Sequence, residues 1–510
     1  MSKQYFCTIA EALFTAIPPF PKRKQLELAF PDGIKVSRKD TYYIDGRESG
    51  RWEKYISAIK SLLRRGRRVV AIFPTLDHAE RFAEAVRRYT PKVTLFAAHL
   101  PRARRFRLWE RIASGEFDCV VGTRLALFAP LPATDLIILD DESHPGHKEE
   151  QHPRYHAREV ATARARLESS TLIIGSELSS LTTFAGIRQG AVKHIDLPPR
   201  KTPATIIDMG RQRKGALSQI VEEAFRNLRR GILVATRLGE GAATRCLDCG
   251  YLFRCPNCDL PLTLHAGGNL RCHHCGHSEP VPSSCPNCHG TQIRPTGGGT
   301  ERLERDLVDR FPGLRVERLE ANQPPPSKWD LLVATVKLLD TELTAPVVAI
   351  SSLDTILELP DPFATERTAQ LLVQLRSRAT EQFFIQTRLP DHPVFKVLED
   401  PESFLAEELA SRITKRYPPA VTLVRLLLQG PDRVKIASRL TELAARLKEK
   451  VSPKAVSVLG PGPAFYEKLK RKYRWHLLVK IHQDDQKLRQ ELKALLPDDI
   501  QIDVNPTDIL

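Results

Sequence analysis

Short apolar runs alternate with amphipathic stretches along much of the chain. Five early runs have the length and the Val, Ile and Leu content of buried strands: 67–74, 92–98, 117–123, 136–141 and 171–176. Between them apolar residues recur every three or four positions, as in residues 77–89, which predicts helices. Strands that alternate with helices form parallel sheets covered by helices. We therefore expect an α/β lobe over residues 41–200.

The same alternation returns later in the chain and is interrupted once. A second series of strand-like runs lies at 204–209, 231–236, 315–320, 329–335, 346–351 and 382–387. It predicts a second α/β lobe over residues 201–395, with a cysteine-rich module at 245–290 inserted into it. The tail, residues 396–510, mixes strands with an amphipathic helix and predicts an α+β domain. Residues 1–40 are too few to bury a core and are interpreted as a short N-terminal extension.

The inserted module carries four CxxC pairs: Cys246/Cys249, Cys255/Cys258, Cys272/Cys275 and Cys285/Cys288. Two such pairs complete a tetrahedral site of four thiolates, so the module predicts two closed, structural zinc sites. The spacing alone allows nested or adjacent pairing. Disulfides are the alternative, but they are rare in the cytosol, where a chain with this N-terminus is expected. Nearby histidines are alternative ligands, although eight thiolates already fill two sites: His265, His273, His274, His277 and His289.

The charge balance changes the picture of what the protein binds. The chain of 510 residues has 77 Lys and Arg against 61 Asp and Glu, a net charge of +16. Basic clusters at 64–68, 102–107 and 468–474 favour a nucleic-acid partner over charge that serves solubility alone. No run of about 18 apolar residues is present, so no membrane span is expected.

One basic stretch in the tail also contains aromatic residues. The side chains that we expect to contact DNA are Lys468, Lys470, Arg471, Lys472 and Tyr473. In this hypothesis Lys and Arg hold phosphates while Tyr473 and Trp475 stack on bases. The alternative is that Trp475 begins a strand and packs in the core.

Several motifs resemble those of the PriA family of bacterial replication-restart helicases, from about residue 41 to the C-terminus. They are VVGTRLALFAP at 120–130, the run from 128 to 159 that contains DDESH, GGGTERLERDL at 297–307 and GPGPAFYEKLKRKYRWHLLVK at 460–480. The resemblance implies two RecA-like helicase lobes, a zinc-ribbon insertion and a C-terminal domain. It also implies nested pairing, in which Cys246, Cys249, Cys285 and Cys288 bind one zinc ion and Cys255, Cys258, Cys272 and Cys275 bind the other. The family's N-terminal DNA-binding domains are expected to be missing.

The chain departs from the family at the residues that bind ATP. The family's phosphate loop corresponds here to GRESGRWEKY, which keeps Gly46 and Gly50 but is one residue shorter. Arg51 stands where a Lys binds phosphate, and Trp52 where a hydroxyl binds Mg²⁺. Arg does not replace a Lys point charge in a tight loop.

Two further ATP motifs are also altered. Asp140 and Asp141 begin the family's DEEH motif as DDES, so the Glu that positions the attacking water is shortened to Asp. In the second lobe Arg378 is kept, whereas Glu381 replaces an arginine finger. We therefore expect a cytoplasmic, nucleoid-associated protein that binds single-stranded or forked DNA and replication-restart (primosome) proteins, with no ATP or Mg²⁺ cofactor. An active ATP-dependent 3′→5′ helicase and a zinc adapter that binds only proteins are the alternatives.

Overall fold

The computed structural model describes residues 4–7, 9–16, 40–197, 202–210, 217–235, 244–256, 261–265, 268–272, 276–295, 300–319, 324–469 and 471–509. The chain divides into two compact units. Unit 1 is Met1–Pro199 with Asp485–Ala494 and Ile502–Val504; unit 2 is Arg200–Asp484 with Leu495–Gln501 and Asn505–Leu510.

Unit 1 is built on a seven-stranded sheet in the order β3-β4-β2-β5-β6-β1-β7, in which every pair is parallel. Its strands are β1 (Thr41–Asp45), β2 (Arg68–Ile72), β3 (Val93–Phe96), β4 (Cys119–Gly122), β5 (Thr134–Asp140), β6 (Thr171–Ser176) and β7 (Lys193–Ile195). The central strands are buried along almost their whole length, which explains their nearly uninterrupted apolar sequences. Strand β7 was not predicted because its three residues, KHI, are exposed and show no apolar pattern.

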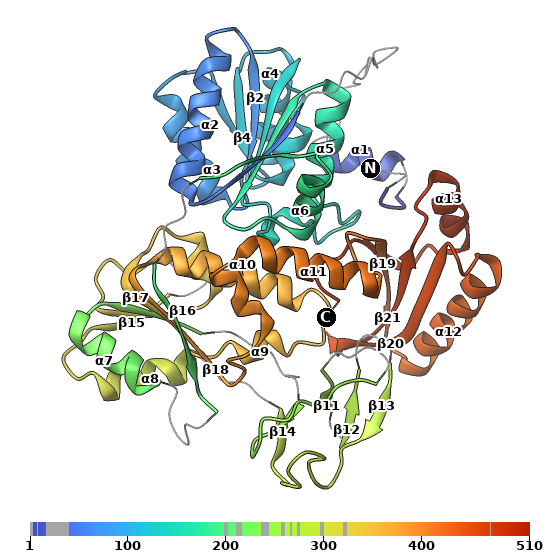
Figure 1. Cartoon of the computed structure of the whole chain (residues 1–510). Coiled ribbons are helices and arrows are strands. Elements are labelled where there is room, and N and C mark those ends of the chain that lie inside the picture. Colours follow the sequence, from blue (N-terminus) through green and yellow to red (C-terminus); the bar gives the residue numbers. More distant parts are fainter. Residues whose placement is uncertain are drawn as a thin grey trace. The chain divides into compact units, whose positions relative to one another are not determined.

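Helices cover both faces of this sheet (Figure 1). They are α2 (Glu48–Leu63), α3 (Leu76–Arg87), α4 (Arg102–Ala113), α5 (Ala157–Glu168) and α6 (Leu181–Arg188), with short 3-10 turns at 124–128 and 145–147. Two helices begin at a residue whose side chain caps the first turn. Thr75 accepts a hydrogen bond from the His78 amide at α3, and Ser180 accepts one from the Thr183 amide at α6. The apolar faces of α2 and α3 pack on β1, β2, β4 and β5 in one core.

Part of the N-terminal segment, which was interpreted as a short extension, is buried against unit 1. Tyr5, Phe6 and Cys7 are buried, and helix α1 (Ile9–Ala16) follows them. The Tyr5 hydroxyl donates a hydrogen bond to the Glu159 carboxylate on α5. Three consecutive residues suited to burial were not recognised because no periodic pattern surrounds them.

Unit 2 contains a second parallel sheet, six-stranded, in the order β15-β16-β9-β17-β18-β8. Its strands are β8 (Ala204–Asp208), β9 (Gly231–Val234), β15 (Val316–Arg318), β16 (Leu331–Ala334), β17 (Ala345–Ile350) and β18 (Ala379–Thr387). Its helices are α7 (Gln219–Leu228), α8 (Thr300–Arg310), α9 (Asp354–Leu357) and α10 (Ala364–Arg378), with short 3-10 turns at 336–340 and 393–398. Helices α7 and α8 bury Phe225 and Leu307 in a shared core with β9, β16 and β17.

The cysteine-rich module separates β9 from α8 and forms two small antiparallel sheets. Strands β10 (Thr244–Cys246) and β14 (Ile293–Pro295) pair at its base, while β11 (Thr263–His265), β12 (Asn269–Arg271) and β13 (Ser278–Pro280) form the second sheet. Its small core contains Phe253, Leu262 and Leu270. A core of this size favours stabilisation by metal.

The tail forms the α+β arrangement expected of it. Its elements are α11 (Pro401–Lys415), β19 (Thr422–Gly430), α12 (Arg433–Lys450), β20 (Val456–Leu469), β21 (Lys472–Ile481), α13 (Gln486–Leu495) and β22 (Gln501–Val504), and the sheet order is β20-β21-β19-β22. The fold class is therefore confirmed: α/β, with two RecA-like parallel-sheet domains, a cysteine-rich insertion and a C-terminal domain. In the described ranges, no helix has both the length and the apolar content that crossing a bilayer requires.

Candidate nucleotide and metal sites

The ends of three neighbouring strands in unit 1 meet at the altered phosphate loop. The register pairs Asp140 of β5 with Gly175 of β6, and Gly175 with Ile44 of β1. Because these strands are parallel, their carboxyl ends lie at one edge, where α/β sheets bind ligands. The loop between β1 and α2 therefore lies beside Asp140.

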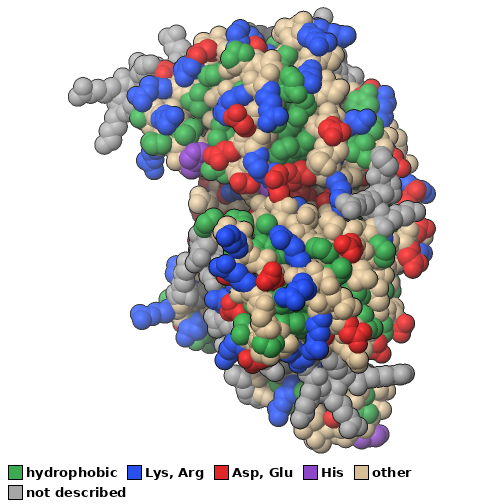
Figure 2. Space-filling view, turned by 90° about the vertical axis from the view of Figure 1, so that its left-hand side faces the viewer, with side chains coloured by type: hydrophobic (Ala, Val, Ile, Leu, Met, Phe, Trp, Pro, Cys, Tyr) green, Lys and Arg blue, Asp and Glu red, His purple; other side chains and the backbone are tan. Residues whose placement is uncertain are grey.

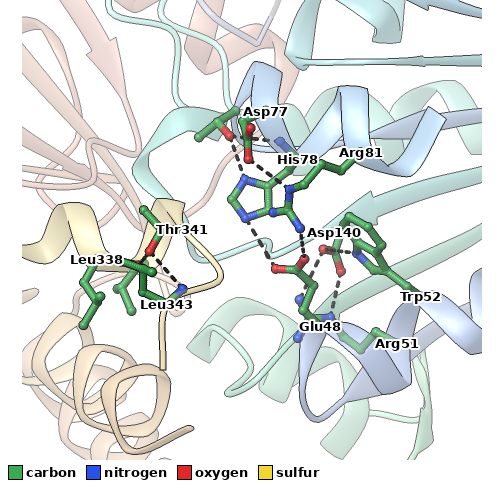
Figure 3. Close-up of polar contacts among 12 residues, drawn as sticks. Glu48, Arg51, Trp52, Asp77, His78, Arg81, Asp140, Leu338, Thr341 and Leu343 are labelled. Atoms are coloured by element: carbon green, nitrogen blue, oxygen red, sulfur yellow. Dashed lines mark hydrogen bonds and ion pairs between the residues drawn. The ribbon is translucent and has the colours of Figure 1, made fainter. Parts of the chain in front are cut away.

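Arg51 and Asp140 form a buried ion pair at this edge (Figure 3). Arg51 Nε lies 2.7 Å from Asp140 Oδ1 and its Nη2 lies 3.2 Å from Oδ2, while its Nη1 donates to the Gly46 carbonyl. Arg51 and Asp140 are only 3% and 1% exposed. Burial lowers the pKa of Arg51, but the charge and hydrogen bonds of Asp140, together with the other acidic groups around it, outweigh burial and raise that pKa well above the usual value. The guanidinium therefore stays charged and is committed to Asp140.

Two other side chains of α2 complete the shell around the same carboxylate. The Tyr55 hydroxyl donates to Asp140 Oδ1 at 2.8 Å, and Trp52 Nε1 donates to Oδ2 at 3.3 Å. Burial first, and then the Asp140 charge, raise the Tyr55 pKa well above its ordinary value, so the hydroxyl keeps its proton. Both carboxylate oxygens of Asp140 thus already accept two hydrogen bonds each.

The retained glycines do not form a phosphate cradle. A Cβ atom on Gly46 would lie 2.9 Å from the Leu197 side chain, and one on Gly50 would lie 3.3 Å from it. Gly46 also has a φ of +115°, a conformation that favours glycine. Leu197 therefore packs over the two glycines, an arrangement that nothing in the sequence indicated because Leu197 lies about 150 residues further along the chain.

A carboxylate occupies the first turn of α2, where a phosphate loop presents backbone amides to anions. Glu48 lies 3.0 Å from Arg81 Nη1 and 3.4 Å from His78 Nε2, both on α3 (Figure 3). Glu48 can be read from the loop sequence GRESGRWEKY as an acidic residue where phosphate would bind, but its contacts with α3 were not predicted.

The Trp52 ring packs against aromatic side chains of the unit 1 core. The indole makes edge contacts with Phe73 and Phe82, at centroid separations of 5.6 and 5.2 Å, and Arg81 lies 5.2 Å from its centroid. Gly175 permits Tyr55 and Arg51 to reach Asp140, because a Cβ at this position would collide with the Tyr55 hydroxyl and the Arg51 side chain.

The rest of the DDES motif is also engaged within unit 1. Asp141 has a positive φ of 50° and accepts from the Ser143 hydroxyl at 3.3 Å. Glu142 is fully buried and accepts from Arg158, the Ser180 amide and the Thr183 hydroxyl.

His147, just after the motif, is buried and donates its Nε2 proton to the Asp140 carbonyl at 2.8 Å. Its burial lowers its pKa to about 3, so the ring is neutral at pH 7.

The second-lobe positions lie in unit 2. Arg378 ends α10 and donates to the Leu339 carbonyl at 3.1 Å, whereas Glu381 is exposed on β18. A strand that begins at Ala379 puts the two residues in different elements.

The outer cysteines of the module come together in unit 2. The sulfurs of Cys246, Cys249, Cys285 and Cys288 all lie within 4.8 Å of one another. Cys246 Sγ is 3.7 Å from Cys288 Sγ, and Cys249 Sγ is 3.7 Å from Cys285 Sγ. A tetrahedral zinc with bonds of about 2.3 Å places its sulfurs about 3.8 Å apart, so the four thiols fit zinc.

Polar groups around this cluster donate to its sulfurs and favour the thiolate form of Cys249. The Asn287 and Gly290 amides donate to Cys285 Sγ and Cys288 Sγ, each at 3.4 Å. The Asn287 side-chain amide, 3.5 Å from Cys249 Sγ, lowers the pKa of that thiol to about 6. None of the cysteines in the described ranges forms a disulfide.

The inner set is described only in part. Cys255 and Cys272 are buried in the core of the module, whereas Cys258, Cys275, His273 and His274 lie outside the described residues. His277 forms a hydrogen bond with Glu279 at 3.0 Å.

The tail candidates lie around the β20–β21 hairpin. Lys468, Arg471 and Lys472 are exposed, and Lys470 lies outside the described residues. Lys468 Nζ lies 5.1 Å from the centroid of the half-buried Tyr473 ring. Trp475 is half-buried within β21, opposite Leu428 and Pro463, with Arg433 over its ring at 5.9 Å. This environment agrees with the packing alternative.

Comparison with known proteins gives the chain its relatives. Residues 414–507 match the family model described as the primosomal protein N C-terminal domain, and residues 255–280 match the PriA DNA helicase Cys-rich region domain. The chain is 29% identical to the replication restart protein PriA of Bacillus subtilis, over 95% of this chain and 65% of that protein. It is 32% identical to PriA of Synechocystis sp. (90% and 61%) and 28% identical to PriA of Treponema pallidum (100% and 86%). The chain is thus similar to PriA proteins over most of its length.

The match to PriA covers the sites described above, but it covers only part of the length of these PriA proteins. The chain spans 65% and 61% of the length of the Bacillus subtilis and Synechocystis proteins. A solved structure of RecG bound to a three-way DNA junction is 13% identical over 74% of this chain and 44% of that chain, with a TM-score of 0.39, a superposition too loose to carry an argument. The inner cysteine pairs, Cys255/Cys258 and Cys272/Cys275, lie within the PriA Cys-rich match.

Proposed function

We propose that this PriA-like protein binds single-stranded or forked DNA in replication restart and recruits primosome proteins, without hydrolysing ATP or unwinding DNA. One observation carries the proposal: the Asp140 carboxylate, which would hold Mg²⁺, is bound instead by Arg51, Trp52 and Tyr55. A phosphoryl-transfer site needs a Lys and a metal whose charges face the phosphates. Here the cation and the carboxylate neutralise each other.

Binding of phosphate at α2 is opposed by two further features. Glu48 puts a negative charge in the first turn, where the helix dipole would otherwise favour an anion. Leu197 packs against Gly46 and Gly50, so it occupies one side of the loop that would have to surround a phosphate. An arginine finger alone is worth about 10³- to 10⁵-fold in rate, and Glu381 stands at one finger position.

Two zinc ions complete the proposal. Cys246, Cys249, Cys285 and Cys288 would hold one ion, and the inner pairs Cys255/Cys258 and Cys272/Cys275 would hold the other. Four thiolates leave no coordination position for water, so zinc would supply folding energy rather than chemistry.

The charge of +16 supports a polyanionic partner. Figure 2 shows Lys and Arg side chains spread over the face in view of both units, interspersed with Asp and Glu. Phosphate contacts of this dispersed kind position a strand without reading its sequence.

The decisive experiment measures phosphate release from ATP with and without forked DNA. We expect background rates in both conditions. DNA-stimulated turnover on the order of 1 per second would instead establish an active helicase motor.

A salt titration with a fluorescent fork tests the DNA partner. Affinity should fall steeply with salt, and K468A/K470A/R471A/K472A should reduce the slope of log K against log salt by about 0.7 for each lost phosphate contact. Absence of binding at about 50 mM salt would leave the protein-only zinc adapter.

A further inference from the structure

One helix of unit 1 carries a cationic stripe that faces a cavity instead of a core. Helix α4 buries Phe106 and Ile112 on one side, and the Phe106 and Trp109 rings stack at 6.4 Å. A second stripe, at i, i+3, i+4 and i+7, is formed by Arg104, Arg107, Leu108 and Arg111. Charged residues ordinarily lie on the solvent-facing side of a helix that covers a sheet, but these three arginines line a cavity.

The stripe lines a cavity of about 670 Å³ at the end of the parallel sheet. Its other walls come from the last residue of α3, from the edge strand β3 and from the loop that follows it. The lining includes four arginines, Arg87, Arg104, Arg107 and Arg111, together with His99, and no lining residue is acidic. Val93, Leu95, Leu100 and Leu108 supply an apolar wall. We call this cavity the α4 groove.

Two of its arginines are available to a ligand. Arg87 pairs with Glu84 at 2.7 Å and Arg111 pairs with Glu116, both at the exposed surface where such pairs contribute little. Arg104 and Arg107 are exposed, and within the described part of the chain neither forms an ion pair or a hydrogen bond. Two adjacent, unneutralised guanidinium groups suit bidentate contacts to phosphate oxygens.

We propose that the α4 groove binds a single-stranded segment of nucleic acid, with its phosphates on Arg104 and Arg107 and a base or sugar against the apolar wall. The inference rests on the DNA binding proposed above and names a site for it. The cavity has the size of small-ligand sites, which corresponds to roughly one or two nucleotides. A single strand can insert its unpaired bases there, whereas a duplex keeps its bases stacked inside.

The structure argues against an acidic peptide that extends the sheet at β3. This edge strand has four residues, of which Val93, Thr94 and Phe96 are buried. Short edge strands are one way in which proteins prevent strand addition. Arginines on a helix beside the strand instead favour contacts through side chains.

The test compares R104A/R107A with the matched variant R166A/R188A, which removes two exposed arginines from unit 1 that lie outside the α4 groove and outside the basic clusters. Binding of fluorescent oligo(dT) is titrated between about 50 and 200 mM salt. We expect R104A/R107A to lower the slope by roughly 1.4, from about 0.7 per contact, and R166A/R188A to leave it at the wild-type value. R104K/R107K should keep the slope, because counterion release depends on charge. Alanine favours helix, so α4 should stay folded, which a thermal melt checks.

Four outcomes would overturn the inference, and only the last of them would also remove the proposed function. If wild-type protein binds oligo(dT) and R104A/R107A has the same slope, the α4 groove is not the site although DNA binding stands. If the slope of log K against log salt falls equally in both variants, the change comes from the lower net charge and not from the α4 groove. If R104A/R107A instead loses binding only to a poly-glutamate peptide, the groove serves an acidic peptide. No binding by the wild type would remove the proposed function, and the inference with it.

Discussion

The altered phosphate loop and the outer cysteine cluster are both positions where a PriA relative would be expected to hold an ion. They differ in whether the protein itself supplies the opposite charge. At the loop, a cation and a carboxylate from the same chain satisfy each other: Arg51 binds Asp140 at 2.7 Å. In the cluster, four thiols of one kind face each other within 4.8 Å. The first site is complete without a ligand, whereas the second is stable as thiolates only with a cation among them.

The difference teaches that ligand-type residues alone do not identify an ion site. Asp140 has the residue type and the strand-end position of a metal ligand, but its oxygens accept from Arg51, Trp52 and Tyr55. The sulfurs have only weak donors at 3.4 to 3.5 Å. What separates the two regions is whether neighbouring side chains bring the opposite charge.

The largest expected effect is loss of the metal. Wild-type protein should contain about two zinc ions per chain, and C246S/C249S and C255S/C258S should each lose about one. Structural zinc contributes on the order of 10 kcal/mol to folding of such modules, so hydrogen exchange over residues 244–295 should become fast in C246S/C249S. Metal analysis and exchange mass spectrometry measure both.

The control for this prediction is C119A, which removes an isolated cysteine buried in unit 1. It should retain both zinc ions. Wild-type protein that contains no zinc, or that contains four disulfides, would contradict the interpretation of the cysteines as zinc ligands.

The next largest effect is expected from R51A, which leaves the buried Asp140 carboxylate without its cation. Removing one partner of a buried ion pair costs about 3–5 kcal/mol, whereas replacing both by apolar residues is often close to neutral. Unit 1 should therefore be much less stable in R51A than in R51M/D140L. Urea unfolding followed by hydrogen exchange in β1 and β5 provides the measurement.

R67A is the matched control, because Arg67 pairs with Asp135 at 3.0 Å but is 58% exposed. Its loss should cost less than about 1 kcal/mol. Equal stability of R51A and R67A would mean that the Arg51–Asp140 pair does not hold the loop closed.

The sequence predicted the architecture more completely than it predicted these contacts. Uninterrupted apolar runs such as 136–141 specify buried strands, and the CxxC spacing specifies the thiol pairs, because both patterns are local. The substitutions at Arg51 and Trp52 predicted the loss of the ATP site, and that loss stays a prediction. The closing role of Leu197 could not be predicted, because it depends on a contact between segments distant in the chain. The exposed β7 had no apolar pattern to reveal it.

A smaller effect concerns pH. Burial lowers the His147 pKa to about 3 from an ordinary value of 6.5, so the folded state holds the ring neutral while the unfolded state protonates it. This contribution to stability is complete above pH 6.5 and is lost as pH falls toward 3, at about 1.4 kcal/mol per pH unit.

His147→Phe should therefore flatten the dependence of unit 1 stability on pH between about 6.5 and 4 by that amount. The slopes are compared rather than the absolute stabilities, since the variant also loses the bond to the Asp140 carbonyl. His99→Ala, at an exposed histidine of the same unit, should leave the slope unchanged. An unchanged slope in His147→Phe would contradict the assignment.

The smallest expected effect is that of restoring the family's residues at the loop. R51K/W52T returns a Lys and a hydroxyl, yet phosphate release with excess single-stranded DNA should stay at background. The loop remains one residue short, Glu48 keeps its carboxylate in the first turn of α2, and Leu197 still packs on Gly46. Tyr55 still donates to Asp140 at 2.8 Å, so the carboxylate stays turned toward the protein. Because losing Trp52 also removes ring contacts with Phe73 and Phe82, R51K alone is measured beside the double variant to separate unfolding from inactivity. Turnover on the order of 1 per second in either variant would show that two side chains, and not the closed loop, silence the site.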